Sequence, residues 1–202
     1  MKKVEELEFC FKGTRTYVQG PDIFDAVIDK LKNNYDVNEI TEIKYSAYEM
    51  LYSNADMLVT SNFNKDNYQK INSIITFKIE NKKYYIIVIE NENKIDCSHE
   101  YSEDIVRTKS IINDSKIEFI NITNDSITEI VVSMDKYYFQ ETVTKDGKWI
   151  VTKFEYKNLK DLNDIKNKKL GLELKNNFNN KLTKSIITID NKAVGNLYFS
   201  LI

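Results

Sequence analysis

The chain has 202 residues and nearly balanced charge, with 29 lysines and arginines against 31 aspartates and glutamates. Apolar residues make up 42% of it, enough for a substantial hydrophobic core at this length. A formal net charge of −2 gives no general attraction to nucleic acid or to an anionic membrane, and no apolar run approaches the roughly 18 residues of a membrane span. The N-terminal sequence MKKVEELEF has glutamates where a signal peptide needs its apolar segment, so we expect a cytoplasmic protein.

The first half begins with a strand and a helix. Residues 4–19 predict one long or bent strand, in which Gly13 permits the bend. Gly20 and Pro21 then open an amphipathic helix over residues 21–32, because proline suits the first helical turn. The apolar stripe of this helix, spaced for burial, consists of Ile23, Phe24, Val27, Ile28 and Leu31.

Strands follow the helix. Residues 40–52 show a two-residue period that puts Ile43 and Tyr45 on one face, and another strand begins near Met57. Residues 73–90 predict a hairpin that turns at residues 80–83. Its second arm is apolar on both faces, which indicates a central strand or one that is covered on both sides.

The polar residues 91–115 form a connector with a short helix around 102–112, and the element order then begins again. A strand is expected at 116–123 and a buried helix at 127–143. Four further strands are expected at 149–156, 170–174, 185–189 and 196–202.

Short sequence matches accompany this repeated order. Residues 43–45 match 154–156 at an offset of 111, and 73–76 match 185–188 at 112. Two more matches, 7–9 with 117–119 and 81–82 with 191–192, have an offset of 110. These matches favour an internal duplication. Two unrelated domains with chance matches remain the alternative.

The two cysteines, Cys10 in an apolar strand-like run and Cys97 in the polar connector, have no metal-ligand spacing and no recognisable disulfide framework. We expect free or buried thiols and no metal site.

One helix followed by several antiparallel strands packs most simply when the sheet curls around the helix. In this element order, and in the run from Glu42 to Val59, the chain resembles the hotdog superfamily in its tandem form. The resemblance implies an α+β double hotdog, with a central helix wrapped by a curved antiparallel sheet in each repeat. The first repeat would span residues 1–96, the connector 97–115 and a more diverged second repeat 116–202.

The sequence GPDIFDAV, residues 20–27, resembles the helix start of the β-hydroxyacyl dehydratases of acyl carrier proteins. Gly20 precedes Asp25 by five residues, the spacing of that family's catalytic acid, and Ala26 follows. The resemblance implies Asp25 as a catalytic carboxylate beside helix amides that polarise a thioester carbonyl. The family's histidine would fall near Phe11, and the only histidine of the chain, His99, lies in the connector. Hydrolysis is therefore favoured over dehydration, which needs an acid and base pair.

Other residues near this helix start are candidates too. Asp22 is a second catalytic candidate, and Arg15, Tyr17, Gln19 and Gly20 are candidates for substrate binding. Structural alternatives stay open: Asp22 complements the helix dipole, and Asp25 faces solvent. The alternative to substrate binding is a charged side chain at a strand edge for Arg15 and a packed ring for Tyr17.

The second half lacks this motif. Lys136 faces Asp25 at the 111 offset, and Asp135 and Glu141 are expected on a solvated helix face. We therefore expect an open groove in the first half, and a second groove filled by Met134 and its aromatic neighbours.

The implied function is handling of an acyl thioester, on coenzyme A or an acyl carrier protein, by a thioesterase with no cofactor. A homodimer of double-hotdog units is the implied assembly. The competing class is a non-catalytic hotdog module with a degenerate active site that binds a ligand or a partner.

Overall fold

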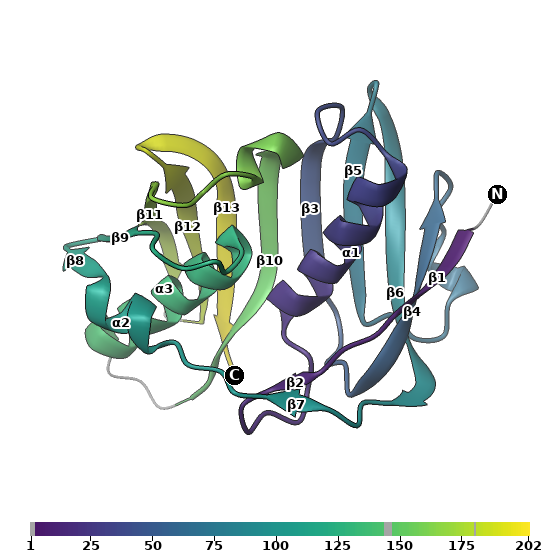
Figure 1. The fold of residues 1–202 in the computed structure, drawn as a ribbon, viewed down its shortest axis with the longest axis horizontal. Helices are drawn as coiled ribbons and strands as arrows, with labels where there is room; N and C mark the ends of the chain where they lie inside the picture. Colours follow the sequence, from purple (N-terminus) through teal and green to yellow (C-terminus); the bar gives the residue numbers. More distant parts are fainter. Residues whose placement is uncertain (1–2, 144–146, 180) are drawn as a thin grey trace. The chain divides into compact units, whose positions relative to one another are not determined.

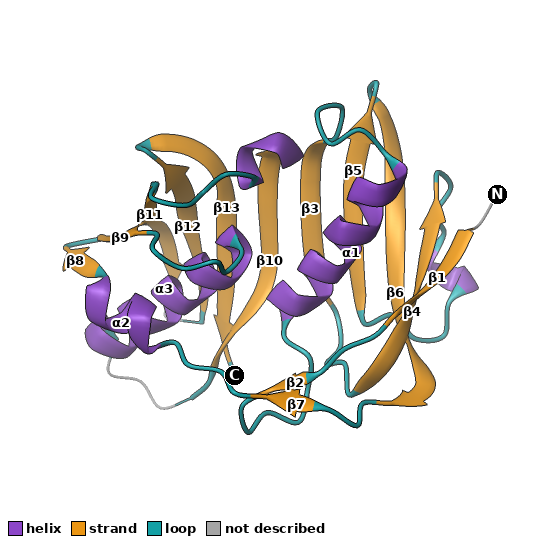
Figure 2. Ribbon diagram, in the orientation of Figure 1, coloured by secondary structure: helices purple, strands orange, loops and turns teal. Residues whose placement is uncertain are grey.

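The structure is a computed structural model that describes residues 3–143, 147–179 and 181–202 (Figure 1). It divides into two compact units: the first ends at Tyr101 and the second begins at Ser102. Each unit combines an antiparallel sheet with one long helix (Figure 2).

The first unit has a five-stranded antiparallel sheet of order β1-β4-β6-β5-β3. A separate pair, β2 and β7, is parallel. In chain order the elements are β1 (Lys3–Leu7), β2 (Phe11–Lys12), α1 (Gly20–Asn34), β3 (Thr41–Ala47), β4 (Ser53–Thr60), the 3-10 helix η1 (Lys65–Asn67), β5 (Ser73–Ile79), β6 (Lys82–Lys94) and β7 (Ser98–His99).

The expected long strand over residues 4–19 is wrong, because β1 and β2 are separate strands in different sheets. The apolar stripe of α1 is confirmed: Ile23, Phe24, Val27, Ile28 and Leu31 are all buried. The helix lies across the sheet in Figure 2, so the stripe forms the core between them.

The second arm of the hairpin, β6, is covered on both sides. On the face away from α1, the buried Ile74 and Ile87 pack with Ile71 and with the rings of Phe63 and Tyr68. The ring of Phe63 also stacks on Tyr85, with 5.3 Å between centroids. The loop between β4 and β5 therefore shields the apolar residues that the sequence placed on the second face.

The second unit has a sheet of order β10-β13-β12-β11-β9-β8, again antiparallel. Its long helix starts at the N-cap Ser126, whose hydroxyl accepts a hydrogen bond from the Glu129 amide at 3.1 Å. The elements are α2 (Asp104–Lys109), β8 (Ile111–Asn113), β9 (Lys116–Ile120), α3 (Ile127–Thr142), β10 (Trp149–Asn158), the 3-10 helix η2 (Leu159–Leu162), β11 (Lys169–Phe178), β12 (Leu182–Ile189) and β13 (Lys192–Leu201).

Both units contain a long helix followed by four long strands, but they differ in the order of these strands in the sheet. In the first unit β4 pairs with β6, the last long strand, and β5 pairs with β3. In the second unit β11 pairs with β12, and β13 pairs with β10. The matched sequences 73–76 and 185–188 thus lie on strands with different neighbours, and the internal duplication stays a prediction.

Both last hairpins turn through two residues in the left-handed region. Glu80 and Asn81 have φ of 48° and 64°, and Asp190 and Asn191 have 47° and 65°. Left-handed conformations at both central positions match the twist of antiparallel strands, and asparagine tolerates them. The expected turn at residues 80–83 is thus shorter, because Lys82 already pairs with Ile79.

Gly195 on β13 lies directly against the neighbouring strand β10. A Cβ atom at this position would lie 2.1 Å from the backbone oxygen of Glu155 and 3.0 Å from Cδ1 of Tyr156. We expect Gly195→Ala to lower the free energy of unfolding of the second unit by about 1 to 3 kcal/mol, because backbone atoms have to move. Urea unfolding followed by Trp149 fluorescence measures this loss.

Gly171→Ala is the matched control for that substitution. Its added Cβ would meet the Thr188 hydroxyl at 2.6 Å, which is a side-chain atom that can rotate away. A cost at Gly171 equal to or above the cost at Gly195 would contradict the assignment of the effect to the β10 backbone.

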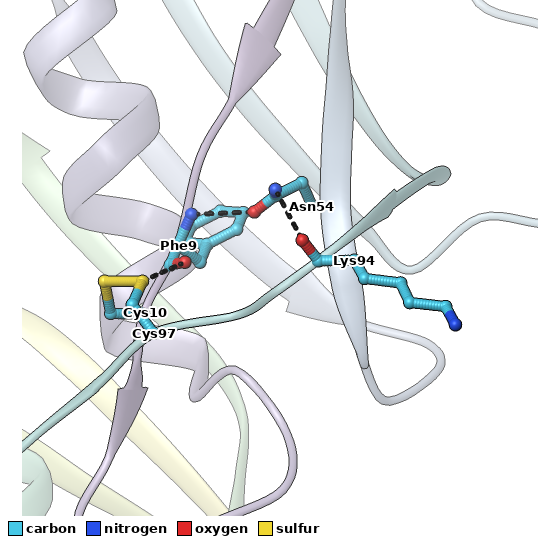
Figure 3. The surroundings of a disulfide bond; sticks show 5 residues. All are labelled: Phe9, Cys10, Asn54, Lys94 and Cys97. Atoms are coloured by element: carbon cyan, nitrogen blue, oxygen red, sulfur yellow. Dashed lines mark hydrogen bonds between the residues drawn. A yellow bond between two sulfur atoms is a disulfide. The ribbon is translucent and has the colours of Figure 1, made fainter.

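A disulfide joins Cys10 and Cys97, so the expectation of thiols is wrong (Figure 3). The two residues are 87 positions apart, and their Cα atoms lie 4.9 Å apart. The parallel pairing of Phe11 with Ser98 and of Lys12 with His99 brings them together. No local sequence signal marks such a distant pairing.

Candidate functional site

The motif residues Gly20 and Pro21 form the beginning of α1. Gln19 is the N-cap in an extended conformation, and its backbone oxygen accepts a hydrogen bond from the Ile23 amide at 3.1 Å. Its side chain makes no capping hydrogen bond. The helix therefore starts where the sequence places it, and its first turn carries Asp22.

Asp22 forms an ion pair with Lys12 of β2, with 2.6 Å between Nζ and Oδ1. Only 13% of the lysine side chain and 17% of the aspartate side chain are exposed, so water screens the pair less than a surface ion pair. Lys12 was not predicted as a site residue, since nothing in its sequence context links it to Asp22. It follows Phe11, the position near which the dehydratase resemblance expects histidine.

Arg15 lies close to Lys12 in the first unit, and both side chains contact the ring of Tyr101. Its Nη1 donates a hydrogen bond to the Lys12 backbone oxygen at 3.4 Å. The guanidinium carbon lies 4.9 Å from the centroid of the Tyr101 ring, and Lys12 Nζ lies 5.0 Å from the same centroid. The ring of Tyr101 thus forms cation–π contacts with both Lys12 and Arg15. The structure brings Arg15 and Asp22 together through Lys12.

Asp25 is half-buried and lies one turn beyond Asp22 on α1. It differs from Asp29 on the same helix, whose side chain is 76% exposed and lies 3.9 Å from Lys32. Tyr17 is half-buried as well, next to Val18, which bridges to Leu51. The roles of Asp25 and Tyr17 remain predictions.

Tyr45 of β3 is a core residue near Asp22 at the start of α1, with 1% of its surface exposed. Burial raises the pKa of its phenol above the ordinary 10, and the nearby negative charge of Asp22 raises it further. Ser73 of β5, which is fully buried, lies beside the phenol. The sequence indicated Tyr45 only as a core residue, so its position beside a charged site residue is new.

His99 lies in β7, where its backbone pairs with Lys12 of β2. The Gly13 amide donates to the His99 backbone oxygen at 2.9 Å. The only histidine of the chain is thus adjacent to the site by backbone pairing, while its side chain is exposed.

The second unit has a buried carboxylate where the sequence predicted a solvated face. Glu141 is exposed as expected, but Asp135 is only 1% exposed. The Ser185 hydroxyl donates to Asp135 Oδ1 at 3.2 Å, whereas Oδ2 has no hydrogen-bond partner among the described residues. Burial raises the pKa of Asp135 from 3.8 to about 7, although the bond from Ser185 opposes this shift.

Helical periodicity contained the signal for this burial. Asp135 lies four residues after the buried Val131 and four before the buried Phe139, in the middle of the inner face of α3. The charge of a carboxylate favours a solvated position, but the place of Asp135 on the inner face of α3 buries it.

The comparison of Asp25 with Lys136 also needs correction. When the two helices are aligned at their N-caps, Gln19 and Ser126, the counterpart of Asp25 is the buried Val132. Lys136 instead pairs with Glu103, with 2.7 and 2.9 Å from Nζ to the two carboxylate oxygens. The second helix thus carries no carboxylate at the position of Asp25.

Among the described residues, no helix is long and apolar enough to cross a membrane. No cluster of three or more histidine, cysteine, aspartate or glutamate side chains in the described part of the chain has the arrangement of a metal site.

The fold is the hotdog fold, as comparison with solved structures shows. The dehydratase domain of PpsC from Mycobacterium tuberculosis, in complex with C12:1-CoA, superposes with a TM-score of 0.56 at 6% identity, covering 100% of this chain and 94% of that one. A putative thioesterase II from Thermobifida fusca gives a TM-score of 0.53 at 5% identity, with 100% and 92% covered. A tesB protein from Mycobacterium avium subspecies paratuberculosis gives 0.52 at 9% identity, with 98% and 93% covered.

No model of a known protein family matches the sequence, and no curated protein does. At identities this low, the structural similarity establishes the fold alone.

Proposed function

We propose that this protein binds acyl thioesters of coenzyme A or an acyl carrier protein and hydrolyses them, as a tandem of two hotdog units with the site at the start of α1. Similar folds occur in a putative thioesterase and in a dehydratase domain with a bound acyl-CoA. The observation that carries the proposal is the charged helix start, where Lys12 pairs with Asp22 and the half-buried Asp25 lies one turn further along.

The two carboxylates have different roles in this proposal. Lys12 engages Asp22 at 2.6 Å, so Asp22 anchors the lysine and is less suited to act as a base. Asp25 orients a water molecule and accepts its proton as the oxygen attacks the thioester carbonyl. Amides at the start of α1, beginning at Gly20, stabilise the developing oxyanion. The carbon–sulfur bond then breaks, and the thiolate leaves and takes up a proton.

The cations at this corner suit the phosphates of a carrier. Lys12 and Arg15 lie together on the Tyr101 ring, and arginine binds phosphate oxygens well because of its fork of donors. Tyr17, Gln19 and Gly20, which follow in the chain, are the proposed contacts to the thioester end of the substrate.

A non-catalytic acyl-binding module is the second candidate, and Phe11 and Lys12 favour it. Phenylalanine cannot transfer protons, and the neighbouring lysine is engaged in an ion pair. A protein of this kind would bind the acyl group and lack the chemistry.

Substitution of Asp25 by asparagine distinguishes the two candidates. We expect Asp25→Asn to lower kcat for acyl-CoA hydrolysis about 100-fold or more with little change in KM, because loss of a general base typically costs that much. Thiol release from a panel of acyl-CoA and acyl carrier protein thioesters measures the rate, and product analysis detects dehydration.

Asp29→Asn is the matched control, since Asp29 is an exposed carboxylate on the same helix. Equal hydrolysis by the Asp25→Asn and native proteins would remove Asp25 from the mechanism. Saturable acyl binding without turnover by the native protein would establish the binding module instead.

A further inference from the structure

The two cysteines of the disulfide lie immediately before the two short strands of the β2–β7 pair. Cys10 directly precedes β2, and Cys97 directly precedes β7. The Phe11 amide donates to the Cys97 backbone oxygen at 3.0 Å, and the Gly13 amide donates to the His99 oxygen at 2.9 Å. One covalent bond and short backbone pairing therefore join two segments that are distant in the sequence.

Cys10 belongs to a segment that is fixed by backbone hydrogen bonds at both ends. Before it, the buried Phe9 is held by its amide, which donates to Asn54 Oδ1 at 2.9 Å (Figure 3). After it, the buried Val18 is held by its amide, which donates to the Leu51 oxygen at 2.8 Å. We call residues 10–17, between these anchors, the strap.

The strap is weakly packed. All of its residues are exposed or half-buried, and both residues of β7, its partner strand, are exposed. Backbone pairing between two-residue strands next to water opens more readily than pairing within a long buried sheet. The covalent bond is thus a more durable connection between the strap and the segment that carries Tyr101 than this backbone pairing.

The strap carries the cations of the proposed site. Lys12 reaches Asp22 at the start of α1, and Lys12 and Arg15 both lie on the Tyr101 ring. Tyr101 lies just after β7, in the segment that carries Cys97. The disulfide between Cys10 and Cys97 therefore helps to fix the positions of both cations relative to α1 and Tyr101.

We propose that the Cys10–Cys97 disulfide is a redox control of the site at the start of α1. In the oxidised protein the bond holds the strap against β7 and keeps Lys12 on Asp22. In the reduced protein the strap separates from β7, and Lys12 and Arg15 leave the corner beside α1.

The reductant is a dithiol, either small or on a protein. Both cysteines are exposed, so one of its thiolates can attack a sulfur of the disulfide, and a mixed disulfide forms while one protein thiolate leaves. The second thiol of the reductant then displaces the other protein sulfur. Two electrons and two protons pass to the protein, which ends with two thiols, and the reductant ends as a disulfide.

Hydrogen exchange of the oxidised and reduced protein tests the structural part of this proposal. We expect reduction by a small dithiol to speed exchange of the Phe11 and Gly13 amides at least tenfold within the first minutes, while β5 and β6 stay protected over that time. The variant with both Cys10→Ser and Cys97→Ser should exchange like the reduced protein in either condition. Unchanged exchange at Phe11 and Gly13 after complete reduction would overturn the proposal.

The effect on ligands rests on the proposed function. We expect reduction to weaken acyl-CoA binding at least fivefold, and Lys12→Met to weaken it similarly while the disulfide is intact. The double serine variant should bind weakly whether or not a reductant is present. Equal binding by the oxidised and reduced proteins would overturn the control of the site even where the strap opens.

The two proposals fail in different ways. Absence of acyl-CoA binding in both redox states would refute the proposed function, whereas the exchange of the strap amides would still decide whether the disulfide holds the strap and Lys12 in place. Tight acyl-CoA binding with no redox effect on exchange or affinity would retain the function and eliminate the control.

Discussion

Asp135→Asn is expected to stabilise the second unit above neutral pH, by up to about 4 kcal/mol. The carboxyl of Asp135 is buried between α3 and β12, and burial raises its pKa from 3.8 to about 7. Each pH unit of difference between the folded and unfolded pKa corresponds to about 1.4 kcal/mol, and the difference here is about 3 units. Asparagine keeps the shape of the side chain and removes the charge that the core disfavours.

The direction of the pH dependence follows from which state holds the proton. Between about pH 4 and pH 7 the folded protein keeps Asp135 protonated while the unfolded chain has released the proton. The contribution of Asp135 to stability is therefore fully present below about pH 4, and it is lost as the pH rises through about 7. Asp135→Asn should match the native protein near pH 4 and exceed it at pH 8.

Trp149, the only tryptophan of the chain, reports on this part of the core. Its ring stacks on Phe139 of α3, with 4.3 Å between centroids, so its fluorescence follows the packing of that helix. Urea unfolding at a series of pH values gives the free energies. Glu141→Gln, on the exposed side of α3, is the control and should leave the pH profile unchanged. A variant no more stable than the native protein at pH 8 would show that Asp135 ionises without cost.

The local elements of this fold were predictable because their signals are local. The apolar stripe of α1 from Ile23 to Leu31 and the hairpin at residues 73–90 occur as expected, since periodicity and turn residues decide them. The apolar residues on both faces of β6 predict that both faces are covered, but they do not specify that the loop between β4 and β5 covers the outer face.

The order of strands in each sheet could not be predicted from the repeated element order. The β5–β6 and β12–β13 hairpins look alike in sequence, yet the strand that contacts β4 is β6 whereas the strand that contacts β11 is β12. A hairpin forms through its own turn, but its placement depends on long-range contacts along both edges, which no short match encodes.

For the candidate site, the sequence located the helix start and missed its partners. Gly20, Pro21 and Asp22 could be placed because they follow the rules of a helix N-terminus. Lys12 reaches Asp22 from β2, which pairs with a strand near the end of the first unit, so the contact depends on tertiary structure that no local pattern encodes. Asp135 is the opposite case, since helical periodicity indicates its burial while its charge favours a solvated position.

Removal of the disulfide should lower the stability of the first unit markedly. We expect the double substitution Cys10→Ser and Cys97→Ser to reduce the free energy of unfolding of this unit by about 3 to 4 kcal/mol. The bond joins residues 87 positions apart, and closing a loop of that length restricts the unfolded chain strongly. Measured contributions of disulfides usually fall somewhat below the entropic limit, which is about 4.6 kcal/mol for such a loop.

Urea titration with pulsed hydrogen exchange gives the unfolding midpoint of β4, β5 and β6 separately from the strap. The native protein, treated with a reductant and then alkylated, is the control for the serine substitutions, and both should show the same lower midpoint. Lys12→Met, which keeps the disulfide and with it the restriction of the unfolded chain, should lower the midpoint less. Equal midpoints for the oxidised protein and the double serine variant would mean that the unfolded chain is already compact enough for the bond to restrict little.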